Sequence, residues 1–268
     1  MGPLDGRRAL VCGSTRGIGR ACAFEFARLG ARVTLLARDD EALRRVRSEL
    51  EASGGSAASG RTLGHEHLVA DFTDPESVRA AVAPYVERTG PIEILLNNTG
   101  GPPAGAIAEA ETSAFLLGFS AHLLCNHILA TALVPGMRQA GYGRIINIIS
   151  TSVKQPIPGL GVSNTIRGAV AAWSKTLAGE LAPFGITVNN ILPGATATER
   201  LRSFVLSRAR ATGMDEKDVE RRMQADIPLG RFARPEEIAS AAGYLATPDA
   251  GYITGVSLPV DGGRTACL

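Results

Sequence analysis

Residues 7–19, which read RRALVCGSTRGIG, decide the fold. The apolar run Ala9–Cys12 predicts a short buried strand, and apolar residues at helical spacing follow from Ile18 to a stop at Gly30. Three glycines mark the turn between them: Gly13, Gly17 and Gly19. A strand, a glycine turn and a helix are typical of a dinucleotide-binding corner. Glycine lets the backbone approach a pyrophosphate, and the helix N-terminus offers free N–H groups.

The spacing of this triplet is Gly-x-x-x-Gly-x-Gly, and in a chain with 31 glycines it is also compatible with an ordinary loop. The rest of the chain favours the dinucleotide corner, because apolar runs and helical patterns alternate along it. Further strands are expected at 32–37, 67–70, 92–96, 144–149, 186–192 and 256–260. Helices are expected from 40 to 52, after Pro75, at 112–139, 161–182 and 199–226, and after Pro235.

This alternation predicts the α/β class, with a single-domain Rossmann-type, doubly wound parallel sheet of about seven strands and helices on both faces. No linker or change of composition divides the chain. We therefore expect one dinucleotide-binding domain over residues 1–268, with a helical substrate lid at about 195–230.

The composition narrows the function classes. A formal net charge of +2 argues against nucleic-acid or membrane-surface binding, and no apolar run is expected to span a bilayer. Four cysteines lack the spacing of a metal site or a disulfide scaffold, which favours a reducing, cytoplasmic location: Cys12, Cys22, Cys125 and Cys267. His65 and His67 flank Glu66, but no third ligand is evident. We expect no metal and place these residues at a strand edge.

In a doubly wound sheet, ligands bind beyond the carboxyl ends of the strands. Several glycine-rich or polar segments follow the predicted strands and therefore share that edge. They are Gly13–Gly19, Arg38, Asp71, Asn97–Gly100, Ser150–Ser152 and Pro193–Gly194.

The order and spacing of these segments resemble the short-chain dehydrogenase/reductase family, and in particular bacterial reductases of 3-oxoacyl carrier-protein substrates. The resemblance covers essentially all 268 residues. The segments that carry it are Gly13–Gly19, Asp71, Asn97–Gly100, Ser150, Pro193–Gly194 with Thr198, and the tail Tyr252–Gly263.

The resemblance implies a role for each segment in holding a nicotinamide cofactor. The glycine loop would hold the pyrophosphate through Gly13, Ser14, Thr15, Arg16, Gly17, Ile18 and Gly19. Asp71 would hydrogen-bond adenine with Phe72 beside it. The alternative is that Asp71 is only a carboxylate at a helix start, but the neighbouring motifs favour the cofactor contact. Two further sets follow later strands: Asn97, Thr99 and Gly100 would line the groove, and Pro193, Gly194 and Thr198 would hold the nicotinamide end.

Two arginines bear on the choice of cofactor. An acidic residue at the end of the second strand would bind the ribose hydroxyls of NAD, but this position is Ala37. Arg38 and Arg16 stand where phosphate-specific relatives carry basic residues, and an arginine fork suits a 2′-phosphate. The sequence therefore favours NADP(H) over NAD(H). The alternative is that Arg38 forms a solvated pair with Asp39 or Asp40.

The chain departs from the family at the catalytic signature, Tyr-x-x-x-Lys, which lies thirteen residues beyond the family's serine. Counting from Ser150 places Ser163 at the tyrosine and Arg167 at the lysine. A fourth position, usually asparagine, is His122. Of these four positions, only Ser150 matches the family.

This departure removes the proton donor that the family uses. A tyrosine has a pKa near ~10 and can be tuned, whereas a serine hydroxyl is a far weaker acid. Arg167 can hold ribose hydroxyls but stays charged. Two substitute donors are open: Lys154 on the loop after Ser150, and His122, whose reference pKa is about 6.5. Either can instead be structural, as a surface lysine or a histidine within a helix interface.

Two functions from different classes follow. The first is an NADP(H)-dependent oxidoreductase that interconverts a carbonyl and an alcohol with atypical proton chemistry. The second is a catalytically silent nucleotide-binding module that serves as a redox sensor or scaffold. The expected partner is a small-molecule carbonyl or alcohol, free or linked to a carrier or CoA.

Four arginines lie close together in the predicted helix at 199–226: Arg200, Arg202, Arg208 and Arg210. They could bind an acidic substrate or a phosphopantetheine carrier, or they could form a solvated helix face.

The resemblance also implies a homotetramer or homodimer. Its contacts would be made by the predicted helices at 112–139 and 161–182, with a second contact through Tyr252–Gly263.

Overall fold

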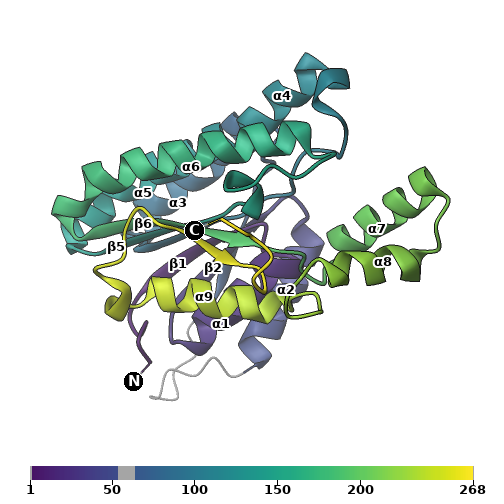
Figure 1. Ribbon diagram of the computed structural model, residues 1–268. Helices are drawn as coiled ribbons and strands as arrows, with labels where there is room; N and C mark the ends of the chain where they lie inside the picture. Colours follow the sequence, from purple (N-terminus) through teal and green to yellow (C-terminus); the bar gives the residue numbers. More distant parts are fainter. Residues whose placement is uncertain (1, 54–63, 268) are drawn as a thin grey trace.

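The computed structural model describes residues 2–53 and 64–267 (Figure 1). Its strands form one parallel sheet of seven strands in the order β3-β2-β1-β4-β5-β6-β7. They are β1 (Arg8–Cys12), β2 (Arg32–Ala37), β3 (Glu66–Val69), β4 (Ile94–Asn97), β5 (Gly143–Ile148), β6 (Ile186–Pro193) and β7 (Ser257–Val260). The winding reverses between β1 and β4, and this reversal opens a crevice at their carboxyl ends.

Helices cover both faces of the sheet (Figure 1). One apolar core lies under α1 (Gly17–Arg28), α2 (Asp40–Ala52) and α9 (Pro235–Ala246). A second lies under α3 (Pro75–Thr89), α5 (Cys125–Ala140) and α6 (Gly161–Leu181). The inner strands are buried on both faces, which explains why their sequences are continuous apolar runs. The predicted fold class is confirmed.

The predicted helix at 112–139 is continuous but not uniform. It consists of α4 (Thr112–Phe119), a π-helical turn at Ser120–Leu124 and α5. The expectation that no apolar stretch could span a bilayer is wrong by length and composition, since Thr112–Ala140 passes that test. Half of its most apolar window is buried, as in the core helix of a globular fold.

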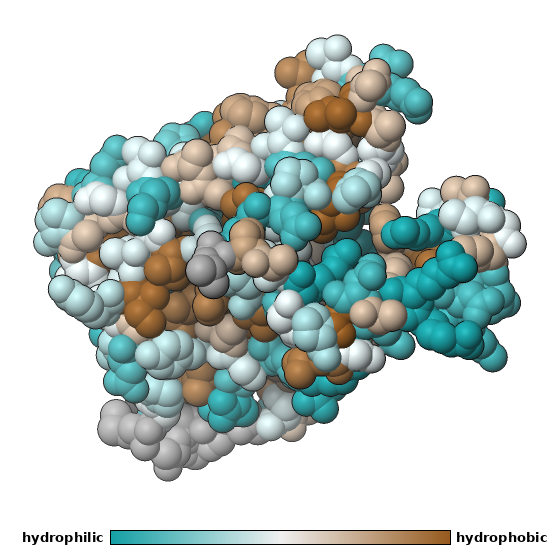
Figure 2. All heavy atoms as spheres, in the orientation of Figure 1, coloured by the Kyte–Doolittle hydropathy of each residue, from teal (hydrophilic) through white to brown (hydrophobic). Residues whose placement is uncertain are grey.

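The predicted helix at 199–226 is two helices, α7 (Glu199–Thr212) and α8 (Glu216–Ala225). Gly213 ends α7 in a left-handed conformation with φ +69°, so the helix cannot continue through it. The pair projects away from the sheet, and its surface is largely hydrophilic (Figures 1 and 2). The predicted loop at 53–60 lies, beyond Ser53, outside the described residues.

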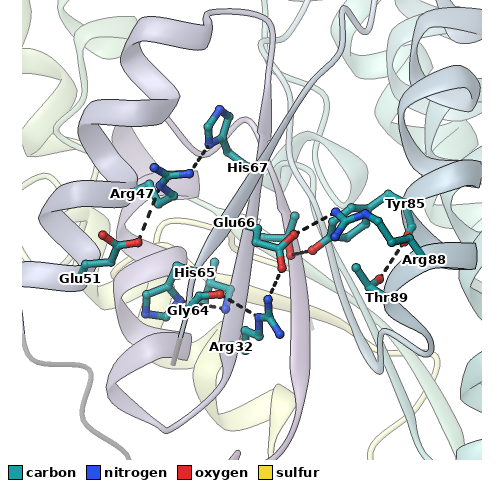
Figure 3. A network of polar contacts seen from close by, with 12 residues as sticks. Arg32, Arg47, Glu51, Gly64, His65, Glu66, His67, Tyr85, Arg88 and Thr89 are labelled. Atoms are coloured by element: carbon teal, nitrogen blue, oxygen red, sulfur yellow. Dashed lines mark hydrogen bonds and ion pairs between the residues drawn. The ribbon is translucent and has the colours of Figure 1, made fainter. Parts of the chain in front are cut away.

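The histidines around Glu66 have structural partners at the sheet edge (Figure 3). His65 Nδ1 accepts the Val33 N–H at 3.0 Å, and His67 contacts Asp40 and Arg47. Glu66 pairs with two arginines, Arg32 and Arg88. Within residues 2–53 and 64–267, no group of three or more His, Cys, Asp or Glu side chains is placed to hold a metal ion.

Candidate active site

The glycine turn after β1 has space only for glycine at two positions. A Cβ built on Gly13, whose φ is +59°, would lie 2.6 Å from the carbonyl oxygen of Asn98. A Cβ on Gly19 would lie 2.2 Å from the carbonyl oxygen of Gly13. The Asn98 amide donates to the carbonyls of Cys12 and Gly13, both at 3.3 Å, and so fixes the turn. The sequence indicates Asn98 only as part of its motif and does not reveal this role.

The N-terminus of α1 is open to an anion. Arg16 is the N-cap residue, and no side chain caps the free N–H groups of the first turn. Ser14 is buried with its hydroxyl 3.5 Å from the Leu36 carbonyl, whereas Thr15 and Ile18 are half-buried along the turn. Uncapped amides beside a tight glycine turn are the arrangement that a pyrophosphate needs. These residues fit the dinucleotide that the sequence predicts.

Arg38 lies exposed at the carboxyl end of β2, and no described carboxylate lies within ion-pair distance of it. Its pairing with Asp39 or Asp40 is wrong: Asp39 caps α2 through the Ala42 N–H, and Asp40 pairs with Arg44 and His67. Arg38 is therefore available to a phosphate.

Asp71 and Arg16, which are also predicted to lie near the adenosine, each already have a partner within the protein. The Thr73 N–H bonds the Asp71 carboxylate at 2.9 Å and is the main factor that lowers its pKa, with Arg38 adding a smaller effect. Asp71 thus shapes the start of α3 while staying beside Arg38. Arg16 pairs with Glu199 at 2.7 Å in a well-exposed ion pair, which costs little to break.

Two predicted cofactor contacts are wrong at the level of side chains. Asn97 is 1% exposed and donates to the Asn147 side chain at 2.8 Å, within the sheet. Phe72 is packed in the core under α3 and α5. Both follow strands, but their side chains point into the protein. Asp71 and Thr99 are partly accessible and Gly100 is exposed, so these remain at the edge.

The end of β6 lies against the glycine turn. The Gly194 N–H donates to the Val260 carbonyl at 3.0 Å, which holds the chain beyond Pro193. Thr198 caps α7 by accepting the Leu201 N–H, and its methyl group would lie 3.3 Å from a Cβ on Gly17. The segment predicted to hold the pyrophosphate and the segment predicted to hold the nicotinamide end therefore lie next to each other.

At the end of β5, Ser150 accepts the Ser152 N–H at 3.1 Å and keeps its own O–H free to donate. Arg167 lies one helical turn after Ser163 on α6, and both are buried, at 8% and 6% exposure. Arg167 Nη1 donates to the Ile148 carbonyl at 2.8 Å, which ties α6 to the strand that carries Ser150. Within the described chain, the Ser163 hydroxyl makes no hydrogen bond.

A second arginine, which the sequence did not single out, reaches the same place. Arg200 donates to the Gly101 carbonyl at 2.9 Å and to the Pro102 carbonyl at 3.2 Å. A Cβ built on Gly101 would lie 2.7 Å from Arg200 Nη2 and 3.2 Å from Arg167 Nη2. Two guanidinium groups therefore flank one glycine.

These charges set the state of His122, which lies in the π-helical turn. His122 is 2% exposed, and burial lowers its pKa well below 6.5, with Arg167 and Arg200 adding to the shift. The expectation that it titrates near 6.5 is wrong, and the ring is neutral at pH 7. Its Nε2 is buried without a partner among the described residues. Burial lowers the pKa of Arg167 to about 10, with Arg200 contributing, so Arg167 remains charged at neutral pH.

Comparisons with known proteins fit this geometry. A family model described as enoyl-(acyl carrier protein) reductase matches residues 13–265. The 3-oxoacyl-[acyl-carrier-protein] reductase FabG of Haemophilus influenzae is 33% identical over 260 residues, which are 97% of this chain and 98% of the relative. The chain belongs to the short-chain dehydrogenase/reductase family. This membership places it among the oxidoreductases.

Two solved structures of related reductases superpose over the full length. L-sorbose reductase from Gluconobacter frateurii, complexed with NADPH and L-sorbose, has a TM-score of 0.91 and 32% identity, and the match covers 100% of both chains. A single-residue variant of actinorhodin polyketide ketoreductase with NADPH has a TM-score of 0.88 and 32% identity, again over 100% of both chains. The predicted preference for NADP(H) agrees with these NADPH-containing structures.

In this short-chain dehydrogenase/reductase, a pocket of about 250 Å³ opens beside the turn that follows Ser150. It is lined by Thr151, Gln155, Pro156, Ile157, Pro158, Asp226, Arg264 and Thr265. Lys154 belongs to the same turn and is half-buried, and it lies next to the pocket rather than within its lining.

Proposed function

We propose that this protein is an NADP(H)-dependent oxidoreductase that interconverts a carbonyl and an alcohol. The observation that carries the proposal is the glycine turn with its uncapped helix N-terminus, next to an Arg38 that has no described carboxylate partner. The turn suits a pyrophosphate, and Arg38 suits a 2′-phosphate. The NADPH-containing reductases described above support this cofactor.

The residues at the end of β5 can position the substrate carbonyl and the ribose of the cofactor. When bound, NADPH supplies a hydride to the carbonyl carbon, and the oxygen takes up a proton, which gives the alcohol and NADP⁺. The free O–H of Ser150 can orient the carbonyl oxygen. Arg167 has five N–H donors, and a protein carbonyl accepts from one nitrogen, so others can hold the ribose hydroxyls.

The proton needs a source other than the residue at the family's tyrosine position. Ser163 is a weak acid, and His122 is neutral at pH 7 and surrounded by cations. We assign the donor role to Lys154, directly or through a water in the adjacent pocket. Support comes from its place in the turn that begins at Ser150 and borders that pocket.

The deciding experiment is NADPH oxidation with a panel of carbonyls, and reduction of NADP⁺ with the matching alcohols, each repeated with NAD(H). Turnover with at least one pair, faster with NADP(H), is the expected result. Tight NADPH binding without turnover by the parent, and by a Ser163→Tyr, Arg167→Lys double variant, would instead support the silent sensor or scaffold.

We also propose a homotetramer or homodimer in the cytoplasm. Exposed apolar side chains on α4 support the assembly: Leu116, Leu117 and Phe119. Four free cysteines, three of them buried, are consistent with a reducing compartment. Light scattering that returned a 27.9 kDa monomer at micromolar concentration would contradict the assembly.

A further inference from the structure

The two guanidinium groups at Gly101 meet without a counter-charge. Arg167 and Arg200 both approach the position of a Gly101 Cβ, yet no described carboxylate lies within 4 Å of either. Glu199 is next to Arg200 in the chain but pairs with Arg16 on the surface. Two positive charges held close together, one of them buried, raise the free energy of the folded protein unless an anionic ligand compensates them.

The donors of Arg167 are also incompletely used. Its Nε is buried and has no acceptor among the described residues, and only Nη1 is bonded to a carbonyl. Arg167 is 8% exposed, so its side chain is largely screened from bulk solvent. Beside it, the Nε2 of His122 is a second buried polar atom without a described partner.

We propose that the substrate carries a carboxylate that binds between Arg167 and Arg200, an inference that rests on the proposed carbonyl–alcohol chemistry and names its substrate class. A planar carboxylate accepts two parallel N–H bonds from guanidinium groups and neutralises the local charge. Because Arg167 is tied to the end of β5, the carboxylate lies close to Ser150, and the substrate is a small oxo acid or the matching hydroxy acid.

The arginine pair is held by other strands than the groups assigned to the phosphates of the cofactor. The glycine turn and Arg38 follow β1 and β2, whereas Arg167 is anchored at β5 and Arg200 bonds the loop after β4. Arg200 is also distinct from the other arginines of α7, because its guanidinium bonds to the 101–102 carbonyls. Arg202, Arg208 and Arg210 are exposed.

The test measures binding without turnover. Acetoacetate and its neutral isostere acetoacetamide are titrated into the protein saturated with NADP⁺, which cannot reduce either one, and heat of binding is recorded. We expect acetoacetate to bind at least ten times more tightly than acetoacetamide. Arg200→Gln should weaken acetoacetate by roughly 10- to 100-fold, the value of a charge-assisted hydrogen bond, and leave acetoacetamide unchanged.

The matched control is Arg202→Gln, an exposed arginine two residues along the same helix, which should leave both affinities unchanged. Arg200→Lys should restore part of the acetoacetate affinity, and unchanged NADP⁺ affinity in each variant shows that the site is intact. Equal binding of the two ligands, or equal losses in Arg200→Gln and Arg202→Gln, would overturn the inference. Displacement of NADP⁺ by acetoacetate would assign the arginines to a cofactor phosphate and overturn it as well.

The two proposals fail in different ways. If acetoacetate binds with this arginine dependence but no carbonyl is reduced by NADPH, the carboxylate site stands and the proposed reaction is wrong. If neutral carbonyls are reduced but a carboxylate on the ligand does not increase its affinity, the proposed reaction stands and the carboxylate site is wrong.

Discussion

The glycine turn at β1 and the arginine pair at β5 and α7 differ in how their polar groups are satisfied. At the turn, the Asn98 side chain holds the carbonyls of Cys12 and Gly13, and the free groups are backbone amides. At Gly101, two guanidinium groups approach the same glycine, and Arg167 retains a nitrogen without a partner among the described residues. The turn itself is held by uncharged groups, whereas the arginine pair concentrates positive charge.

This difference separates what the family shares from what is particular to this chain. A pyrophosphate is the same in every relative, so the turn can follow the family pattern. The reacting group varies, and here Ser163 stands at the family's tyrosine position and Arg167 at its lysine position. In the proposed function, the proton route depends on Lys154, and the charge of the arginine pair favours an anionic substrate.

The largest expected effect concerns the proton route. Lys154→Met should lower turnover by ~10²–10⁴, the usual value of general acid catalysis, with little change in NADPH affinity. Ser163→Ala should cost much less, because a serine is a poor acid. Steady-state kinetics with a reactive carbonyl and NADPH titrations give both quantities. A fully active Lys154→Met beside an inactive Ser163→Ala would show that the serine is the catalytic group.

The second largest effect is expected from a substitution that distorts the glycine turn at β1. Gly19→Ala would bring a Cβ within 2.2 Å of the Gly13 carbonyl, so the turn must shift away from its cofactor-binding shape. We expect roughly a 100-fold loss of NADPH affinity. Gly179→Ala is the matched control, since that helical glycine on α6 has open space for a Cβ. Equal NADPH affinities in the two variants would show that the turn does not hold the cofactor.

Local patterns predicted the strands and most helix ends, because a buried parallel strand is a continuous apolar run whatever surrounds it. They did not predict which polar residues at strand ends turn inward. Asn97 was expected in the groove, but its register partner in β5 is Asn147, and the two amides bond inside the sheet. Pairing between distant strands determines that outcome.

The sequence did not predict that Arg167 and Arg200 lie close together, for the same reason. Arg200 stood in a run of arginines on a predicted helix, and nothing local distinguished it from Arg202. Its contacts are with residues about a hundred positions earlier in the chain. The pKa of His122 likewise depends on two guanidinium groups contributed by other helices.

A smaller effect tests the cofactor preference of the first region. Arg38→Asp should weaken NADPH by about tenfold or more, through loss of a charge-assisted bond to the 2′-phosphate, and should strengthen NADH, since an acid at this edge can bind ribose hydroxyls. Fluorescence titrations with both cofactors measure the change. Arg44→Asp is an exposed-arginine control, which also removes an ion pair with Asp40. If the ratio of the two affinities is the same before and after Arg38→Asp, the assignment is wrong.

The smallest effect probes the arginine pair through the pH dependence of stability. The folded-state pKa of His122 lies well below the value near 6.5 expected when unfolded. Below pH 6.5 the unfolded chain therefore binds a proton that the folded chain does not. Stability should fall as the pH drops from 6.5 toward the folded pKa, with a limiting slope of about 1.4 kcal/mol per pH unit from this residue.

His122→Asn, which introduces the residue usual at this position in the family, should reduce that slope. Urea unfolding of both proteins between pH 7.5 and 5 measures the difference. Burial also lowers the pKa of His65. The contributions of His65 and of the carboxylates to the slope are the same in the two proteins, so they cancel in the comparison. Because Arg167 and Arg200 help to keep the ring neutral, Arg200→Gln should also reduce the slope, by less than His122→Asn. Identical slopes in the parent and His122→Asn would mean that folding does not lower the pKa of this histidine.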